Sequence, residues 1–165
     1  MKTRNIVTGA LLSALSLMIS LVFGQSLSVF IPPFSATLAS HVPTMIAFTV
    51  SPGAAVMVGL VSAFGFLIAK GPVVAARALV HAVFGFVGAC SYRKDGSLLK
   101  ALAITAPIHA LGEALAVIPF GFDLRTAFLI VGVGTIIHHG IDAAITLAVV
   151  KSLSKSRNFL EAKRI

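Results

Sequence analysis

Charged side chains are scarce in this sequence. Asp, Glu, Lys and Arg together make up 11% of its 165 residues, whereas soluble domains carry about 25% charged residues. Hydrophobic residues make up 58% of the chain, which is more apolar surface than a soluble core of this length needs. The shortage of charge argues against an ordinary soluble domain. We therefore expect an integral membrane protein that is surrounded by the lipid bilayer.

Acidic residues are the rarer charged group, because five Asp and Glu stand against 13 Lys and Arg and give a net charge of +8. In a soluble protein this excess would suggest a nucleic-acid partner. Here the basic residues lie in short loops and tails, where they report membrane topology instead. We therefore expect no nucleic-acid partner.

Tryptophan is absent, and Cys90 is the only cysteine. A single cysteine excludes an internal disulfide, and because Cys90 lies in an apolar run we expect it to pack as a small hydrophobic residue. The sequence also has no GxxxxGK[ST], GxSxG, HExxH or CxxC pattern. We therefore expect no ATPase or other enzymatic activity in this chain, no cofactor and no resident metal.

Long apolar segments are what the sequence has in abundance. The first imitates a signal peptide, but its apolar run exceeds the usual length of roughly 7–15 residues, so we expect it to be a membrane helix. A spanning helix needs about 20 apolar residues, and turn-forming residues separate six candidates. The sequence thus predicts an all-α integral membrane protein. Residues 1–165 would form a single domain of six transmembrane helices, at 6–23, 36–50, 53–69, 73–92, 98–120 and 126–153.

The distribution of basic residues predicts the orientation of these helices. If both termini lie on one side, that side holds ten Lys and Arg, and the other side holds only Lys70 and Arg125. Because Lys and Arg concentrate in cytoplasmic loops, we expect the N and C termini to be cytoplasmic. The thirteenth basic residue, Arg77, lies inside the fourth predicted helix.

Arg77 is the most unusual residue of the predicted helices. A charged side chain at the middle of a membrane helix costs roughly 2.5–3.5 kcal/mol to insert, so we expect Arg77 to face a partner or a wet cavity. His81 lies one turn later and shares its helix face. Other predicted helices place further ionisable side chains at similar depths, mostly in the outer half of the membrane. These are His41, His109, Glu113, His138, His139 and Asp142.

Together these side chains predict an outward-facing pocket for a small, polar and often anionic molecule. The planar guanidinium of Arg77 matches a carboxylate, and imidazoles can bond either to ring nitrogens or to carboxylates. A structural alternative is that Arg77 pairs with Glu113 and that the histidines bond across helices.

A metal site is another use of the same residues. His109 and Glu113 are spaced i, i+4 and can share a ligand site on one helix face. The adjacent His138 and His139 point about 100° apart on a helix, so only one of them can share a site with Asp142. An intramembrane metal enzyme is therefore an alternative function.

Two segments resemble a known family. In the first predicted helix, Ala10-Leu-Leu-Ser-Ala14 looks like the AxxxA motif of the substrate-binding S components of energy-coupling factor (ECF) transporters. The segment 31–43, IPPFSATLASHVP, followed by VSPG at 50–53, resembles the loop and second helix of the niacin-specific members. Six predicted helices and a short basic N-terminus fit the same family.

The resemblance implies a high-affinity binding subunit of an ATP-driven vitamin importer, in a prokaryotic plasma membrane. Its implied partners are a transmembrane T subunit, which would contact Ala10 and Ala14, and two cytoplasmic ATPase subunits. The implied vitamin is niacin, as nicotinate or nicotinamide, bound in the outer half of the membrane. From the predicted depths of the residues, and not from the resemblance, we expect Arg77 to meet its carboxylate and Phe34, Phe120 or Phe122 to close over its ring.

Two alternatives stay open beside niacin uptake. Five histidines and two intramembrane acids exceed what one small acid requires, so the ligand could be pantothenate, hydroxymethylpyrimidine or another vitamin precursor. The chain could also be a stand-alone carrier or channel that needs no partner subunit.

Overall fold

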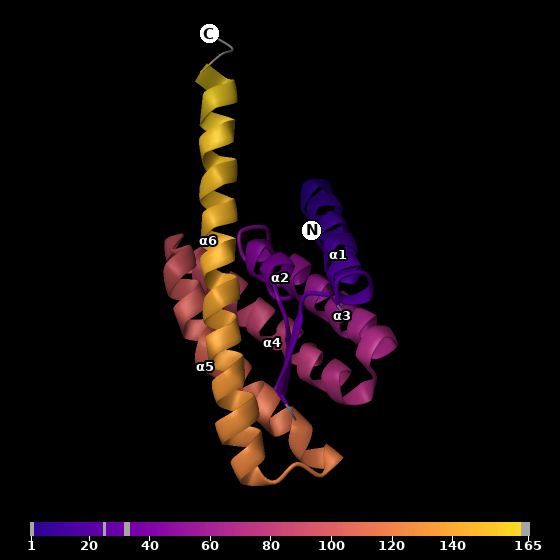
Figure 1. The fold of residues 1–165 in the computed structure, drawn as a ribbon. Coiled ribbons are helices and arrows are strands. Elements are labelled where there is room, and N and C mark those ends of the chain that lie inside the picture. The colour runs from indigo at the N-terminus through magenta and orange to yellow at the C-terminus, as the bar shows by residue number, and fades with distance from the viewer. Residues whose placement is uncertain (1, 25, 32–33, 163–165) are drawn as a thin grey trace.

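The computed structural model describes residues 2–24, 26–31 and 34–162, with side chains described as far as residue 155. In chain order (Figure 1), its elements are α1 (Thr3–Leu21), β1 (Ser28–Ile31), β2 (Phe34–Thr37), α2 (Val42–Ala47), α3 (Pro52–Lys70), α4 (Pro72–Asp95), α5 (Leu98–Val117), η1 (Ile118–Phe120), η2 (Thr126–Gly132) and α6 (Val133–Ala162).

Five of the predicted membrane spans are confirmed as helices that are long and apolar enough to cross a bilayer. They cover Thr3–Leu21, Pro52–Lys70, Pro72–Asp95, Leu98–Phe120 and Thr126–Lys155. The chain is therefore a mainly helical, multi-pass membrane protein. The last span begins at the predicted residue but as a π-helix, η2.

The start of η2 is held by a short acidic cap. Asp123 accepts hydrogen bonds from the backbone N–H of Thr126 at 3.0 Å and from its hydroxyl at 2.6 Å. These bonds favour the ionised carboxylate, so they hold the pKa of Asp123 below its usual range. A negative charge at this end of the helix also suits the positive pole of the helix dipole.

The prediction of a spanning helix over residues 36–50 is wrong. Residues 36 and 37 belong to β2, and the helix in this segment, α2, has six residues. Six residues rise only about 9 Å, far short of the roughly 30 Å hydrocarbon core. Ala39 has a φ of 65°, which a right-handed helix excludes. Pro43 stands in the first turn of α2 and restrains the residue before it.

The segment that replaces this helix still crosses the bundle. Cβ atoms added to Gly9 and Gly65 would meet Ala54 and Ser20 respectively, so α1 and α3 pack as parallel neighbours. The chain between them must therefore return along the bundle, and it does so through β2 and α2. Most side chains of 40–48 are buried. Non-helical backbone is tolerated at membrane depth only where protein covers it, and here the surrounding helices provide that cover.

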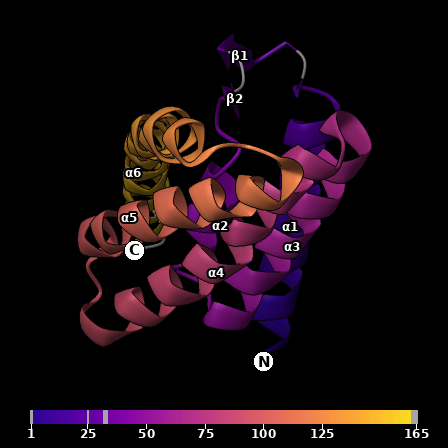
Figure 2. The same cartoon turned by 90° about the horizontal axis from the view of Figure 1, so that it is seen from below.

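Helix α4 lies at the centre of the bundle and packs against both α3 and α5 (Figure 2). A Cβ added to Gly59 of α3 would lie 2.4 Å from the backbone nitrogen of Ala82 in α4. The two helices therefore touch backbone to backbone, which small residues at their interface allow. Helix α6 covers α5 from the other side, and the β1–β2 hairpin lies between α6 and the α1–α3 pair (Figures 1 and 2).

An apolar core closes one side of the polar residues described below. Its largest members come from four elements and include Met45, Phe48, Val58, Phe84 and Leu102. The ring of Phe84 lies 4.5 Å from the ring of His109, measured between centroids. The polar cluster therefore rests on packed hydrocarbon, which keeps water away from that side.

Candidate functional site

The centre of the site is an ion pair between α4 and α5. Nε and Nη2 of Arg77 donate to Oε2 of Glu113 at 2.9 and 2.6 Å. Both side chains are buried, with relative exposures of 6% and 4%. Arg77 stands in the second turn of α4 and Glu113 near the end of α5, so the two antiparallel helices bring them to one end of the bundle. The ion pair compensates a charge that would otherwise be unpaired inside the membrane.

The two carboxylate oxygens of Glu113 have different neighbours. The hydroxyl of Thr135 also donates to Oε2, at 2.6 Å. Oε1 instead faces histidines: Nε2 of His109 lies 3.2 Å away and Nε2 of His81 lies 3.9 Å away. Oε2 is therefore saturated by donors, while Oε1 is turned toward the imidazole cluster.

Arg77 also joins the hairpin to the bundle. Its Nη1 donates to the backbone oxygen of Ser35 in β2 at 3.2 Å, and its guanidinium carbon lies 5.1 Å from the centroid of the Phe34 ring. A guanidinium has five N–H groups, and three of them make the bonds described here. Among the residues that the structure describes, none accepts from the other two N–H groups, which can meet another acceptor.

The second acid, Asp142 of α6, organises the return segment. Its two carboxylate oxygens accept the backbone N–H groups of Ala39 and His41 at 2.9 and 3.0 Å. Nδ1 of His41 lies 2.9 Å from one of these oxygens, and Nε2 of His138 lies 3.4 Å from the same one. Asp142 is completely buried. The unusual backbone at Ala39 is therefore held in place by a carboxylate from another helix.

The adjacent histidines of α6 point to different partners, as predicted from their spacing. His138 donates from Nε2 to the backbone oxygen of Thr37 at 3.1 Å, and it is the one that approaches Asp142. His139 donates from Nε2 to the backbone oxygen of Leu102 at 3.1 Å, and its Nδ1 lies 3.0 Å from Nδ1 of His109.

The imidazole rings gather around His41. Its centroid lies 4.4 Å from those of His109 and His138, and 4.6 Å from that of His81. All five histidines of the chain are buried. The structure thus brings together all the ionisable residues that the sequence predicted for the pocket: His41, Arg77, His81, His109, Glu113, His138, His139 and Asp142.

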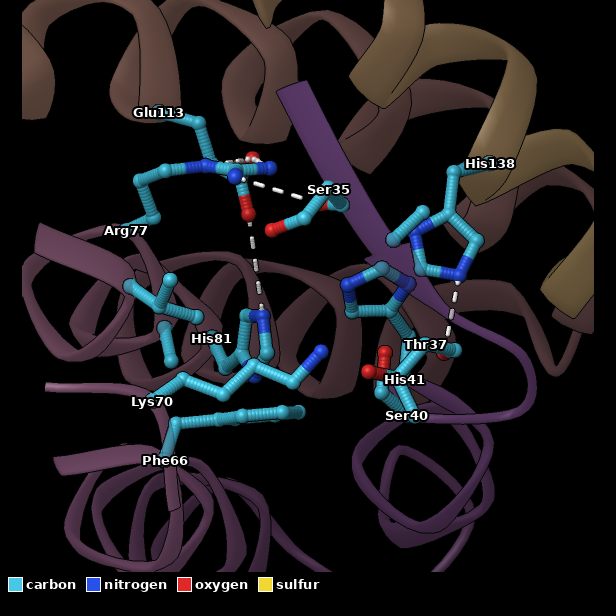
Figure 3. A pocket seen from close by; sticks show the side chains of 13 residues that line it. Ser35, Thr37, Ser40, His41, Phe66, Lys70, Arg77, His81, Glu113 and His138 are labelled. Carbon is cyan, nitrogen blue, oxygen red and sulfur yellow. Dashed lines mark hydrogen bonds and ion pairs between the residues drawn. The ribbon is translucent and has the colours of Figure 1, made fainter. Parts of the chain in front are cut away.

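A cavity of about 20 Å³ lies among these side chains (Figure 3). Its lining includes Arg77, His81, Glu113, His138 and His41, whereas His109, His139 and Asp142 lie behind it. This volume holds about one water molecule. A molecule as large as a vitamin can therefore enter only if part of the lining moves.

Several residues of the site were missed by sequence reasoning. Ser62 of α3 bonds to Nδ1 of His81 at 3.1 Å, Thr135 bonds to Glu113, and Lys70 lines the cavity from the end of α3. Serine and threonine are common in membrane helices, so no pattern in the sequence distinguishes these two from the rest. The sequence does show Lys70 as a basic residue, but there it is counted only as a loop charge that reports topology.

The remaining predicted residues lie outside the cavity. Phe34 is buried against Arg77 and Gly134, and it lines an apolar groove beside β2 rather than the polar cavity. Ala10 and Ala14 are exposed on α1. They lie about 100° around the helix from Gly9 and Ser13, which are buried.

Comparison with known proteins gives one relative of defined function. The niacin transporter NiaX of Lactococcus lactis subsp. cremoris (strain MG1363) is 32% identical over 172 aligned residues, which cover 94% of this chain and 77% of the relative. No family model matches the chain, and no solved structure matches it.

Proposed function

Because the chain belongs to the family of ECF S components that includes the niacin transporter NiaX, we propose that it is the substrate-binding subunit of an ATP-driven importer of niacin. It would bind the vitamin tightly and contribute no catalysis of its own. The ATPase subunits and the T subunit would be separate chains. This is the division of labour that the absence of a P-loop motif already favours.

The observation that carries the proposal is the buried guanidinium of Arg77 beside the cavity. Nicotinate combines a carboxylate with an aromatic ring that contains a nitrogen. The two N–H groups that Arg77 has left can meet a carboxylate in the bidentate manner that guanidinium favours. Among the neighbouring imidazoles, His138 lines the cavity and can bond to the ring nitrogen.

Entry of the vitamin requires β2 to move. The cavity is lined on one side by Ser35 and Thr37, and their backbone oxygens accept the bonds from Arg77 and His138. A ligand that offers acceptors to the same two side chains can replace the strand. Binding would therefore exchange hydrogen bonds to β2 for hydrogen bonds to the vitamin.

The test is a thermal-shift screen of the full chain in detergent against nicotinate, nicotinamide, pantothenate and hydroxymethylpyrimidine. A ligand that binds only the folded state stabilises it by RT ln(1 + [L]/Kd), about 2.7 kcal/mol at a hundredfold excess over Kd. We expect the largest rise in Tm with nicotinate or nicotinamide. A rise with pantothenate or hydroxymethylpyrimidine alone would keep the family and replace the vitamin, and no rise with any of them would refute the binding role.

A further inference from the structure

The histidine cluster contains more nitrogen ligands than the recognition of one small acid needs. One ring nitrogen from each of His41, His81 and His109 and one carboxylate oxygen of Glu113 lie within 4.8 Å of one another, and all four residues are buried. We propose that these four residues bind a divalent transition-metal ion. The inference stands on this geometry and does not depend on which vitamin the protein carries.

The spacing of the ligand atoms suits a tetrahedral ion. Metal–ligand bonds of about 2.0–2.1 Å place neighbouring ligand atoms roughly 3.4 Å apart in a tetrahedral site. Nε2 of His109 lies 3.2 Å from Oε1 of Glu113, and Nε2 of His81 lies 3.9 Å from it. These distances bracket the expected value. The other oxygen of Glu113 is occupied by Arg77 and Thr135, so Oε1 is the one left for an ion.

The hydrogen bonds around His109 leave two acceptors facing each other. His139 donates from Nε2 to the backbone oxygen of Leu102, so the Nδ1 of a neutral His139 is an acceptor. The 3.0 Å contact between the two Nδ1 atoms then requires His109 to donate. A neutral His109 thus turns the lone pair of Nε2 toward the carboxylate of Glu113. Only a cation between the two, a proton or a metal ion, makes this contact favourable.

The other two histidines each have one nitrogen beside a polar group of the protein. Nδ1 of His41 lies 2.9 Å from the carboxylate of Asp142, although the pair lacks the alignment of a hydrogen bond. Nδ1 of His81 is bonded to the hydroxyl of Ser62 at 3.1 Å. Metal-binding histidines typically have their second nitrogen fixed by a carboxylate, a carbonyl or another polar group. One proton could serve one such nitrogen, whereas one metal ion serves all three.

A second group of side chains, His41, His138 and Asp142, is also close enough to hold an ion. Asp142, however, already accepts two backbone N–H groups, and Nε2 of His138 is committed to the backbone oxygen of Thr37. We therefore assign the ion to the group that contains Glu113. From the sequence we expect no resident metal, because there histidines pair only within single helices, whereas this site joins the residue before α2 to α4 and α5.

The donor set defines the class of ion. Three imidazoles and one carboxylate suit Zn²⁺, and also Ni²⁺ or Co²⁺, whereas Mg²⁺ and Ca²⁺ prefer an all-oxygen shell. The cavity of about 20 Å³ reaches His41, His81 and Glu113. An ion can therefore enter from the same side as the proposed vitamin.

The test uses the full chain, purified without a histidine tag and stripped with a chelator. Zn²⁺ is added, free ion is removed on a desalting column, and bound metal is counted by mass spectrometry. Co²⁺ is added in a parallel sample, because a tetrahedral Co²⁺ site has a characteristic intense visible absorption. We expect one Zn²⁺ per chain and a tetrahedral Co²⁺ spectrum. Less than a stoichiometric amount of metal, with no such spectrum, would overturn the proposal.

Matched histidine variants locate the ion. We expect His81→Gln and His109→Gln each to weaken Zn²⁺ binding by at least roughly 100-fold, since even partners behind the ligands contribute about 10–100-fold. Cys90→Ser removes the only thiol and should leave binding unchanged. Gel filtration and circular dichroism establish which variants are folded. Undiminished binding in either folded histidine variant, or loss with Cys90→Ser, would refute the assignment.

Discussion

Arg77 shows that one buried charged residue can both require compensation inside a membrane protein and offer a binding group. Its insertion is unfavourable unless the charge is compensated, and Glu113 supplies that compensation through two hydrogen bonds. The guanidinium nevertheless keeps two N–H groups and lines the cavity. The same side chain can therefore hold the helices together and bind an anion, and the structural and functional interpretations of Arg77 are compatible.

Substitutions at this pair separate the two roles. Arg77→Ala leaves the carboxylate of Glu113 buried and unpaired, so we expect it to lower the free energy of unfolding by about 3–5 kcal/mol. The double variant Arg77→Met/Glu113→Gln removes both charges and should recover most of that loss. It should nevertheless fail to bind nicotinate. Thermal unfolding measures the first effect and isothermal titration calorimetry the second.

The control for the pair is Arg125→Met, which removes an exposed arginine from the loop before η2. We expect no change in stability or in nicotinate binding. Unchanged nicotinate affinity in the double variant would remove Arg77 from the binding site. A single variant as stable as the double variant would contradict the buried ion pair.

Among the elements, α1 has two faces with different surroundings. Gly9 and Gly65 form close contacts between α1 and α3, while Ala10 and Ala14 are exposed one turn apart on another face. Two small residues at this spacing make a shallow strip that lets a second helix approach closely. This arrangement supports the proposal that α1 docks on the T subunit.

Bulky residues on this strip test the docking role. Ala10→Trp and Ala14→Trp should leave vitamin binding intact, because neither residue lies at the cavity, but should greatly reduce uptake in cells that contain the T and ATPase subunits. Radiolabelled niacin uptake and detergent binding assays measure the two effects. Ala103→Trp places the same bulk on an exposed position of α5 and should leave uptake unchanged. Normal uptake with either α1 variant would refute the docking role of that residue.

The return segment shows the limit of periodicity as a predictor of elements. Residues 36–50 are apolar and resemble a short span, yet β2 pairs with β1 in register, with Ser28 opposite Thr37 and Ile31 opposite Phe34. The strand pairing is local, but the carboxylate of Asp142 that holds the backbone of the next turn comes from a distant part of the chain. Local sequence therefore could not specify this segment.

At the scale of the whole molecule, the long α6 extends beyond the other helices toward the C-terminus (Figure 1). Its last described side chains include the exposed Lys151 and Lys155. These two lysines are among the basic residues from which the cytoplasmic C-terminus is predicted. The proposed site lies at the opposite end of the bundle, beside the end of α3 and the start of α4.

The partner subunits are tested by reconstitution. If this chain is a binding subunit, liposomes that contain it alone should bind niacin without accumulating it, and accumulation should require ATP, the T subunit and both ATPase subunits. Filter assays of internal radiolabelled niacin measure the difference, with an inactive ATPase variant as control. Accumulation by the chain alone under an ion gradient would instead indicate a stand-alone carrier.

The sequence by itself determined that this is a membrane protein, where five of its spans lie and which ionisable side chains lie within the bundle. These properties depend on local composition, segment length and the position of charge. Only the tertiary structure decided that His41 joins the cluster from a non-helical segment, that His138 and His139 serve different partners and that one oxygen of Glu113 faces the imidazole cluster. Those outcomes depend on how separate helices approach one another, and that approach is set by packing between distant residues such as Gly59 and Ala82.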